Sequence, residues 1–253
     1  MNITQWSNVA LMVALVWSPP GEPAAAFSRE HQSAAGEKTT VLVLPKRRGS
    51  EARSELPPPL PPLTDVTPLT LDVTIEVQEA TGHGSIFRRR VSRANDRVHV
   101  AEGDGREWLF ERNSRDSRRV SGLFVDHGRH VIVVYDESDL RNTQGIRGWT
   151  DVLTLGFDPE LLKRLQAGTT VRRIDGQPFV RYTALHDDVP VQEVWWSAAQ
   201  ALPTDVLTTG GGGSVRLRIE HARRGVDSTI LQAPPTRFPT YRVIDFADYL
   251  ERH

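Results

Sequence analysis

Residues 69–80 read LTLDVTIEVQEA, and this stretch alternates strictly between apolar and polar side chains. Leu71, Val73, Ile75 and Val77 fall on one side of an extended chain, and acidic, hydroxyl or amide side chains separate them. Successive side chains of a β-strand point to opposite faces, so the pattern predicts an antiparallel strand with one face in the core and one in water. We expect the folded domain to begin here.

Short strands of similar character follow along the rest of the chain. Turn-forming stretches such as RAND, EGDG, DHGR, DDVP and GGGGS separate them. The predicted strands cover residues 85–93, 96–102, 107–113, 118–126, 130–136, 171–176, 179–186, 191–197, 205–209 and 215–223. Roughly ten short strands in a row are typical of an antiparallel meander or barrel.

A helical insertion interrupts these strands over residues 137–170, where the period of two disappears. Asp158 suits a helix N-cap, Pro159 suits the first helical position and Gly168 suits the end of the helix. The residues before Asp158 predict another turn or two of amphipathic helix. An insertion with one apolar face is well suited to cover a concave sheet as a lid or plug.

Several central strands carry large apolar side chains on both faces. The stretch HVIVVYD at residues 130–136 is one example, and the adjacent Trp195 and Trp196 place one indole on each face of another strand. By simple alternation, Trp195 shares the face of Val191 and Trp196 shares that of Val194. Because one face of an antiparallel sheet ordinarily meets water, we predict a mainly β (α+β) fold, a strongly curved sheet or half-barrel covered by the insertion.

The candidates for lining the hollow of this half-barrel are large apolar residues of the central strands and the insertion. They are Trp108, Phe110, Val133, Tyr135, Trp149, Leu161, Leu165, Trp195, Trp196 and Leu217. Of the two adjacent indoles, one is expected inside the hollow and the other beneath a helix or the outer edge of the sheet. The register of the strand decides which is which.

The N-terminal segment, residues 1–26, has the features of an export signal. An apolar run over residues 9–17 leads through a Pro-Pro-Gly break to three alanines, which fit a small-residue cleavage pattern. We expect cleavage near Ala26 and localisation in the periplasm. The apolar run is shorter than the about 20 residues that span a bilayer, so no integral membrane span is predicted, and an uncleaved anchor is the alternative.

A proline-rich spacer is predicted over residues 27–68, ahead of a half-barrel domain at 69–253. Its prolines lack the amide hydrogen that regular structure requires, so the spacer is expected to be disordered and extended. The stretch TTVLVLP at 39–45 has strand character, but nothing near it in sequence offers a partner. Docking of the spacer on the aromatic groove of a partner is an alternative.

The composition restricts the classes of function. Lysine and arginine number 31 and aspartate and glutamate 32, so the formal charge of −1 favours neither nucleic acid nor a membrane surface. The absence of cysteine excludes disulfides, thiolate catalysis and zinc–cysteine sites. Arginine clusters at 88–93 and 112–119 are interpreted as solvated strand and turn faces.

Motifs for catalysis are scarce. There is no G-x-S-x-G elbow, and the glycines at 210–213 lack a following Gly-Lys-Ser/Thr, so they predict a hairpin tip rather than a phosphate loop. His127 and His130 flank a turn beside Asp126, and their convergence on zinc would make a metal-dependent hydrolase, which is kept as a remote alternative. We predict no catalytic residues, metal or cofactor.

Three stretches and the order of the elements carry a family resemblance. The stretches are IDGQPFVRYTA at 174–184, EVWWSAAQALPTDV at 193–206 and GVDSTILQAPPTRFPTY at 225–241. Together with the mid-chain insertion, they resemble the periplasmic lipoprotein-carrier superfamily of the LolA, LolB and RseB type over about residues 69–243. The resemblance implies a half-open barrel that shelters acyl chains beneath helices. Those carriers usually place an amphipathic helix before the first strand, where this chain has its spacer.

Two functions of different classes follow. The first is an exported, non-enzymatic binding protein whose hollow accepts a lipid, an acyl chain or the acyl chains of a lipoprotein. The alternative is an envelope protein-interaction or sensor module, in which the barrel is filled and the arginine-rich rim at Arg88–Arg90 contacts another protein. The cavity volume separates the two.

Overall fold

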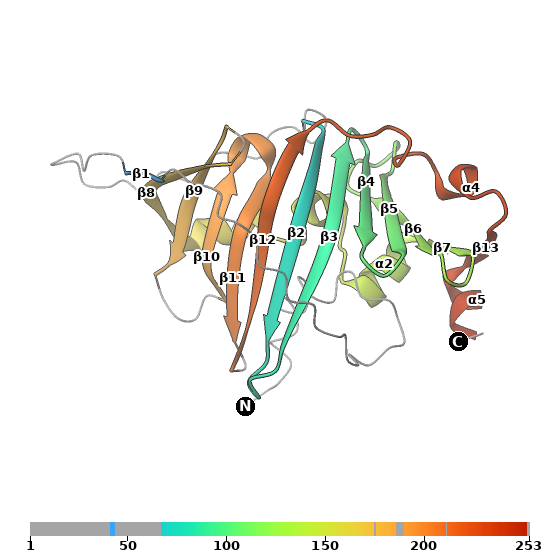
Figure 1. Ribbon diagram of the computed structural model, residues 1–253, viewed down its shortest axis with the longest axis horizontal. Helices are drawn as coiled ribbons and strands as arrows, with labels where there is room; N and C mark the ends of the chain where they lie inside the picture. Colours follow the sequence, from blue (N-terminus) through green and yellow to red (C-terminus); the bar gives the residue numbers. More distant parts are fainter. Residues whose placement is uncertain (1–40, 44–66, 175, 186–189, 211, 252–253) are drawn as a thin grey trace.

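A single sheet dominates the computed structural model (Figure 1). The structure describes residues 41–43, 67–174, 176–185, 190–210 and 212–251. Within these residues, thirteen strands lie in the order β1-β8-β9-β10-β11-β12-β2-β3-β4-β5-β6-β7-β13. The predicted export signal at 1–26, and most of the predicted spacer at 27–68, lie outside the described residues.

All neighbouring strands pair antiparallel except β13 and β7, which pair in parallel. The strands are β1 Val41–Val43, β2 Leu69–Gln78, β3 Gly84–Ala94, β4 Arg97–Glu102, β5 Arg106–Arg112, β6 Val120–Asp126, β7 Val131–Tyr135, β8 Leu165–Ile174, β9 Gln177–Ala184, β10 Val191–Ser197, β11 Leu202–Gly210, β12 Gly213–Arg224 and β13 Arg242–Asp245. The mainly β half-barrel predicted from the sequence is confirmed, and every strand predicted after residue 69 is found.

The helices in the described segments are short. The mid-chain insertion contains α2 Glu137–Gln144, α3 Trp149–Leu153 and η2 Pro159–Arg164. The others are η3 Ala198–Gln200, α4 Pro234–Arg237 and α5 Phe246–Glu251. We call residues 136–164 the plug. In Figure 1 the plug lies behind the sheet, on its inner face. None of the helices in the described segments is long and apolar enough to cross a bilayer.

The helix predicted after Asp158 begins as expected and ends early. The Asp158 side chain caps it by accepting a hydrogen bond from the backbone N–H of Glu160 at 3.0 Å, and Pro159 follows. The element is a 3₁₀-helix that stops at Arg164, so the predicted end at Gly168 is wrong. Residues 165–167 instead join the ladder with β9, and a side chain at Gly168 would press on the backbone oxygen of Arg181. Pairing with a distant strand has overridden the local helical pattern.

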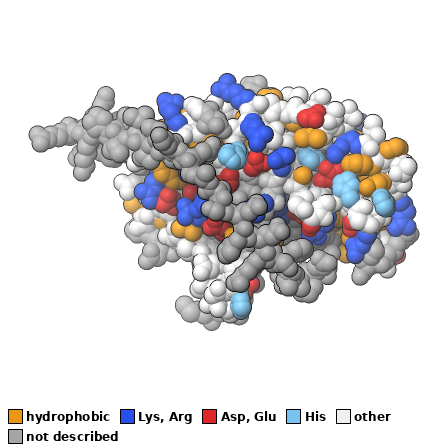
Figure 2. Space-filling model, viewed as in Figure 1, with side chains coloured by type: hydrophobic (Ala, Val, Ile, Leu, Met, Phe, Trp, Pro, Cys, Tyr) orange, Lys and Arg blue, Asp and Glu red, His pale blue; other side chains and the backbone are white. Residues whose placement is uncertain are grey.

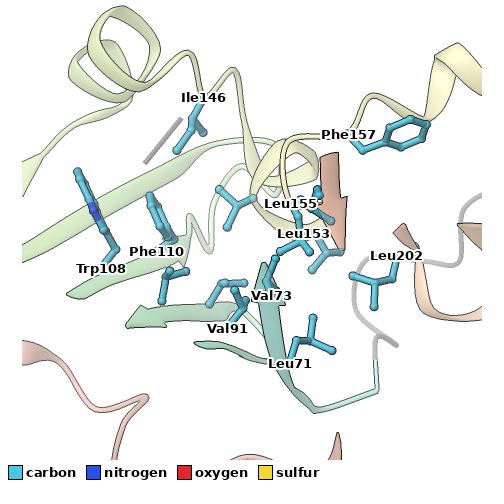
Figure 3. Close-up of a cluster of buried hydrophobic side chains, with 14 of the residues drawn as sticks. Leu71, Val73, Val91, Trp108, Phe110, Ile146, Leu153, Leu155, Phe157 and Leu202 are labelled. Atoms are coloured by element: carbon cyan, nitrogen blue, oxygen red, sulfur yellow. The ribbon is translucent and has the colours of Figure 1, made fainter. Parts of the chain in front are cut away.

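One apolar cluster fills the space between the sheet and the plug (Figure 3). The sheet contributes the alternating side chains of β2 and their neighbours, and Leu71 and Val73 are almost fully buried. The plug contributes Leu140, Ile146, Trp149, Val152, Leu153, Leu155, Phe157 and Leu162. We call the whole cluster, with its sheet and plug residues together, the inner cluster. It confirms that one face of the sheet is apolar and covered by the insertion.

The outer face of the sheet is polar over its centre and covered at one end. Figure 2 shows basic and acidic side chains interspersed on the side seen in Figure 1, and the Arg216–Asp205 pair at 2.8 Å is one example. Leu109, Val125 and Ile132 are fully buried yet lie outside the inner cluster. They share the outer face of β5–β7 with residues that bind the C-terminal segment.

We call residues 226–245 the strap. The Arg97 guanidinium donates a hydrogen bond to the backbone oxygen of Leu231 at 2.8 Å, and Arg237 of the strap pairs with Glu107 at 3.1 Å. Glu107 lies opposite Val125 in the β5–β6 ladder, so both side chains are on the outer face. The strap therefore explains why β5–β7, at one end of the sheet, are apolar on both faces.

The short strand β1 lies within the predicted spacer. Val41, Leu42 and Val43 pair with Arg172, Val171 and Thr170 of β8. Residues 41–43 therefore have a partner more than a hundred residues away in the sequence. The disordered spacer predicted across 27–68 stays a prediction.

Candidate functional site

The structure brings most of the predicted lining residues together in the inner cluster. Trp108, Phe110, Val133, Tyr135, Trp149, Leu165, Trp196 and Leu217 are buried in it, and Leu161 packs against it half-buried. They come from both halves of the sheet and from the plug. Nine of the ten candidates therefore lie in or against the inner cluster, and that they line a ligand cavity stays a prediction.

Trp195 is the exception, because it lies on the outer face. Its indole N–H donates to a carboxylate oxygen of Glu193 at 2.9 Å, whereas Trp196 is 2% exposed and its ring lies 5.5 Å from that of Phe157 in the plug. The prediction that Trp195 shares the face of Val191 is wrong. The pairing of β10 with β11 shifts between Val191 and Glu193, and this bulge reverses the alternation.

A small cavity lies between the plug and the sheet. The interior cavity has a volume of about 20 Å³, which is room for about one water molecule. It is lined by Val73, Ile75, Arg89, Val91, Val100, Leu155 and Leu217. A hollow of about 570 Å³ lies elsewhere, on the surface beside the start of α2, with a polar lining that includes Arg119, Glu137 and Arg141.

Leu155 of the plug closes this interior cavity in a strained conformation. Its φ is 57°, in the left-handed region, although it carries a branched side chain and is only 5% exposed. A non-glycine residue in this region costs about 1–2 kcal/mol relative to the right-handed form. Burial of the leucine side chain holds the plug in a conformation that the backbone alone disfavours.

Arg93 attaches the plug to the sheet from the inside. Its side chain is 1% exposed and donates hydrogen bonds to the backbone oxygens of Leu153 in the plug, at 2.9 Å, and of Gln200 in the β10–β11 connection. In the described segments no carboxylate pairs with it, and burial lowers the pKa of Arg93 to about 10. The guanidinium is therefore a buried cation at neutral pH that clamps two segments through their carbonyl groups.

The predicted arginine-rich rim at Arg88–Arg90 divides between the two faces. Arg88 and Arg90 are exposed, whereas the Arg89 side chain is 8% exposed on the inner face and pairs with Glu102 at 3.0 Å. Burial lowers the pKa of Arg89 and raises that of Glu102, and in each case their mutual attraction opposes the shift. The interpretation of the cluster at 88–93 as a solvated face is wrong at Arg89 and at Arg93.

The predicted zinc-type cluster does not converge. The His127 ring contacts the Tyr241 hydroxyl at 3.0 Å, and the His130 ring lies 5.0 Å from the ring of the same tyrosine. No group of three histidine or acidic side chains in the described part of the chain is placed to hold a metal ion. Both histidines instead secure the strap.

A buried histidine–glutamate pair was missed in the sequence. His99 and Glu107 lie 2.5 Å apart on the outer face beneath the strap, and Arg237 also binds Glu107. Burial raises the pKa of Glu107, but the hydrogen bond and charge of His99 and the charge of Arg237 outweigh it, so the net pKa lies below the usual range. The only signal in the sequence is that two polar residues lie diagonally across the EGDG hairpin, on the same face of β4 and β5.

No protein-family model matches the chain, and no curated protein matches its sequence. Several solved structures align with it. A LolA-superfamily protein from Nitrosomonas europaea is 12% identical, with 67% of this chain and 91% of that chain covered and a TM-score of 0.34. A putative outer membrane lipoprotein-sorting protein domain from Vibrio parahaemolyticus is 10% identical, with 66% and 89% covered and a TM-score of 0.30.

The structure of MucB in complex with MucA(peri) aligns at 17% identity, with 66% of this chain and 54% of that chain covered and a TM-score of 0.33. Two of these three structures are described as a LolA-superfamily protein and a lipoprotein-sorting protein domain.

Proposed function

We propose that the chain is an exported, non-enzymatic binding protein of the periplasm that takes a hydrophobic ligand, a lipid or acyl chain, between the plug and the inner face of the sheet. The observation that carries the proposal is the inner cluster: a curved apolar sheet is covered by a separate segment that a buried cation clamps from within. The N-terminal sequence supports export. If the chain acts as the lipoprotein carriers that its sequence resembles, the ligand would be the acyl chains of a lipoprotein.

Ligand entry on this proposal requires the plug to move, because the interior cavity is about 20 Å³. The hydrophobic effect is not directional, so an acyl chain can replace apolar plug side chains against the sheet. A chain of about ten methylene groups contributes on the order of 8 kcal/mol on burial. That is comparable to what several plug side chains contribute, so exchange between closed and occupied states is energetically reasonable.

Replacing Arg93 with methionine is expected to loosen the plug. The change removes both hydrogen bonds of the clamp, to Leu153 and Gln200, while keeping an apolar stem of similar length. We expect faster amide hydrogen exchange in α3 and faster uptake of a fluorescent fatty acid. Arg97→Met is the matched control, because Arg97 bonds the strap instead.

Unchanged exchange in α3 together with unchanged uptake in the Arg93 variant would contradict the clamp. If the methionine variant does not fold, Arg93→Lys keeps the charge and loses the forked donor geometry, which tests the same contact.

The binding function itself is tested by isolation. The protein is purified from an envelope fraction, and its organic extract is analysed by mass spectrometry. A co-purified lipid, or saturable uptake of fluorescent fatty acid, is expected. Failure of both would reject the proposal.

A second candidate is a protein-interaction or sensor module, and the small interior cavity favours it. Here the plug is permanent core and the exposed surface contacts a partner in the envelope. Replacing the exposed Arg88 and Arg90 with glutamate, while keeping the buried Arg89, is expected to abolish partner capture in a pull-down from envelope extract with the fold intact by circular dichroism. Unchanged capture would reject this module.

A further inference from the structure

Four hydrogen-bond donors in the inner cluster have no acceptor in the described part of the chain. They are the indole N–H groups of Trp108, Trp149 and Trp196 and the hydroxyl of Tyr135. All four side chains are 0–2% exposed. Buried polar groups are nearly always paired in folded proteins, and each unpaired one lowers stability, so four in one cluster need an explanation.

These donors lie along the interface between the plug and the sheet. The rings of Trp108 on β5 and Tyr135 on β7 lie 4.9 Å apart, and both side chains belong to the inner cluster. Trp149 belongs to the plug itself, and Trp196 lies in the other half of the sheet with its ring 5.5 Å from that of Phe157 in the plug. Figure 3 shows Trp108 and Phe110 extending from the sheet toward Ile146 of the plug. A ligand that displaced the plug would meet the three donors that the sheet carries, those of Trp108, Tyr135 and Trp196.

The chemistry of the donors selects among acyl ligands. An indole N–H donates and never accepts, so a suitable partner carries acceptors. A hydrocarbon has none. An amide brings a donor of its own that needs burial, and a carboxylate brings a charge that is costly to bury unpaired. The buried cations Arg89 and Arg93 are already bonded to Glu102 and to backbone carbonyls.

Resting on the proposed function, we infer that the ligand is an acyl ester, and that Tyr135 and the buried tryptophans recognise its ester carbonyl oxygens. An ester offers acceptors without donors or charge, which is the complement of this donor set. Burial raises the pKa of Tyr135, so its hydroxyl keeps its proton and donates across the physiological range.

The test compares hexadecane, methyl palmitate, N-methylpalmitamide and palmitic acid, each displacing a fluorescent fatty acid from the full chain. We expect methyl palmitate to bind more tightly than hexadecane by about threefold to tenfold, which corresponds to one net hydrogen bond. Tyr135→Phe should remove that preference without weakening hexadecane, and the unliganded variant should be at least as heat-stable as the wild type. Tyr182→Phe is the control, since Tyr182 is in the inner cluster but its hydroxyl is not one of the four donors.

The possible failures are distinguishable. If no probe displaces the fatty acid and none binds directly, the proposed function fails. If ester and hydrocarbon bind equally, or if Tyr135→Phe weakens every probe alike, the acyl-ester assignment is overturned while the binding function stands. Should the tyrosine variant not fold, Trp108→Phe removes a neighbouring donor and is judged by the same ratio of ester to hydrocarbon affinity.

Discussion

Replacing Trp196 with alanine is expected to lower the free energy of unfolding by about 3–5 kcal/mol, because the indole is 2% exposed and packs on Phe157 of the plug. The change removes one of the largest side chains of the inner cluster and leaves a cavity between the plug and β10. Urea denaturation followed by circular dichroism measures the loss. Ligand uptake should change as well, since this residue lies on the proposed binding face.

Trp195→Ala is the matched control, one position away on the same strand. Trp195 lies on the outer face, half-buried, and its main polar contact is with Glu193. We expect a loss of about 1 kcal/mol and no change in ligand uptake. Equal losses of stability and uptake in the two variants would show that the assignment of faces in β10 is wrong.

Replacing Glu107 with alanine is expected to destabilise the fold by about 3–5 kcal/mol, because His99 and Arg237 would keep their polar groups beneath the strap without a carboxylate. Loosening of the strap should appear as faster hydrogen exchange across residues 226–245. Glu111→Ala is the control. Its pair with Arg97 is 31–38% exposed, and we expect less than about 1 kcal/mol from it. Equal losses in the two variants would refute the structural role assigned to Glu107.

The same glutamate predicts a pH dependence. Its folded pKa is below its usual value, so the stability it contributes is present above the unfolded pKa of about 4.3 and is lost as the pH falls through the folded value. In acid titrations of unfolding free energy, the wild type should therefore fall more steeply below about pH 4.3 than Glu107→Gln. Parallel curves would remove Glu107 from the acid response.

The sequence predicts the fold wherever the local pattern and the long-range pairing agree. The alternation in β2 and the cap at Asp158 depend on neighbouring residues, and both are found as predicted. The end of η2 and the partner of β1 depend on β9 and β8, which no local pattern reveals. The face of Trp195 depends on a bulge, which breaks the rule of alternation that any sequence argument uses.

The sequence predicts which residues the candidate site contains, but it does not predict whether the site is open or filled. Large apolar residues of two-sided strands are buried in a curved sheet, so nine of the ten candidates lie in or against the inner cluster, and their role in lining a hollow stays a prediction. Whether the hollow is open depends on how the plug packs, and the sequence contains no measure of that. From the sequence alone, Arg93 is expected on the surface. Only the folded chain places two backbone carbonyl groups within hydrogen-bond distance of its guanidinium.

The strap attaches residues 226–245 to strands β4–β7, which come much earlier in the sequence. Arg97 is bonded to Leu231, and Glu107 to Arg237, across separations of more than 120 residues. Contacts of such long range form late and slow folding, because the intervening loop must close before they contribute. During synthesis, Leu109 and Val125 are therefore uncovered until the strap has been made. This apolar surface is hidden only after residues 226–245 have crossed back over β4–β7.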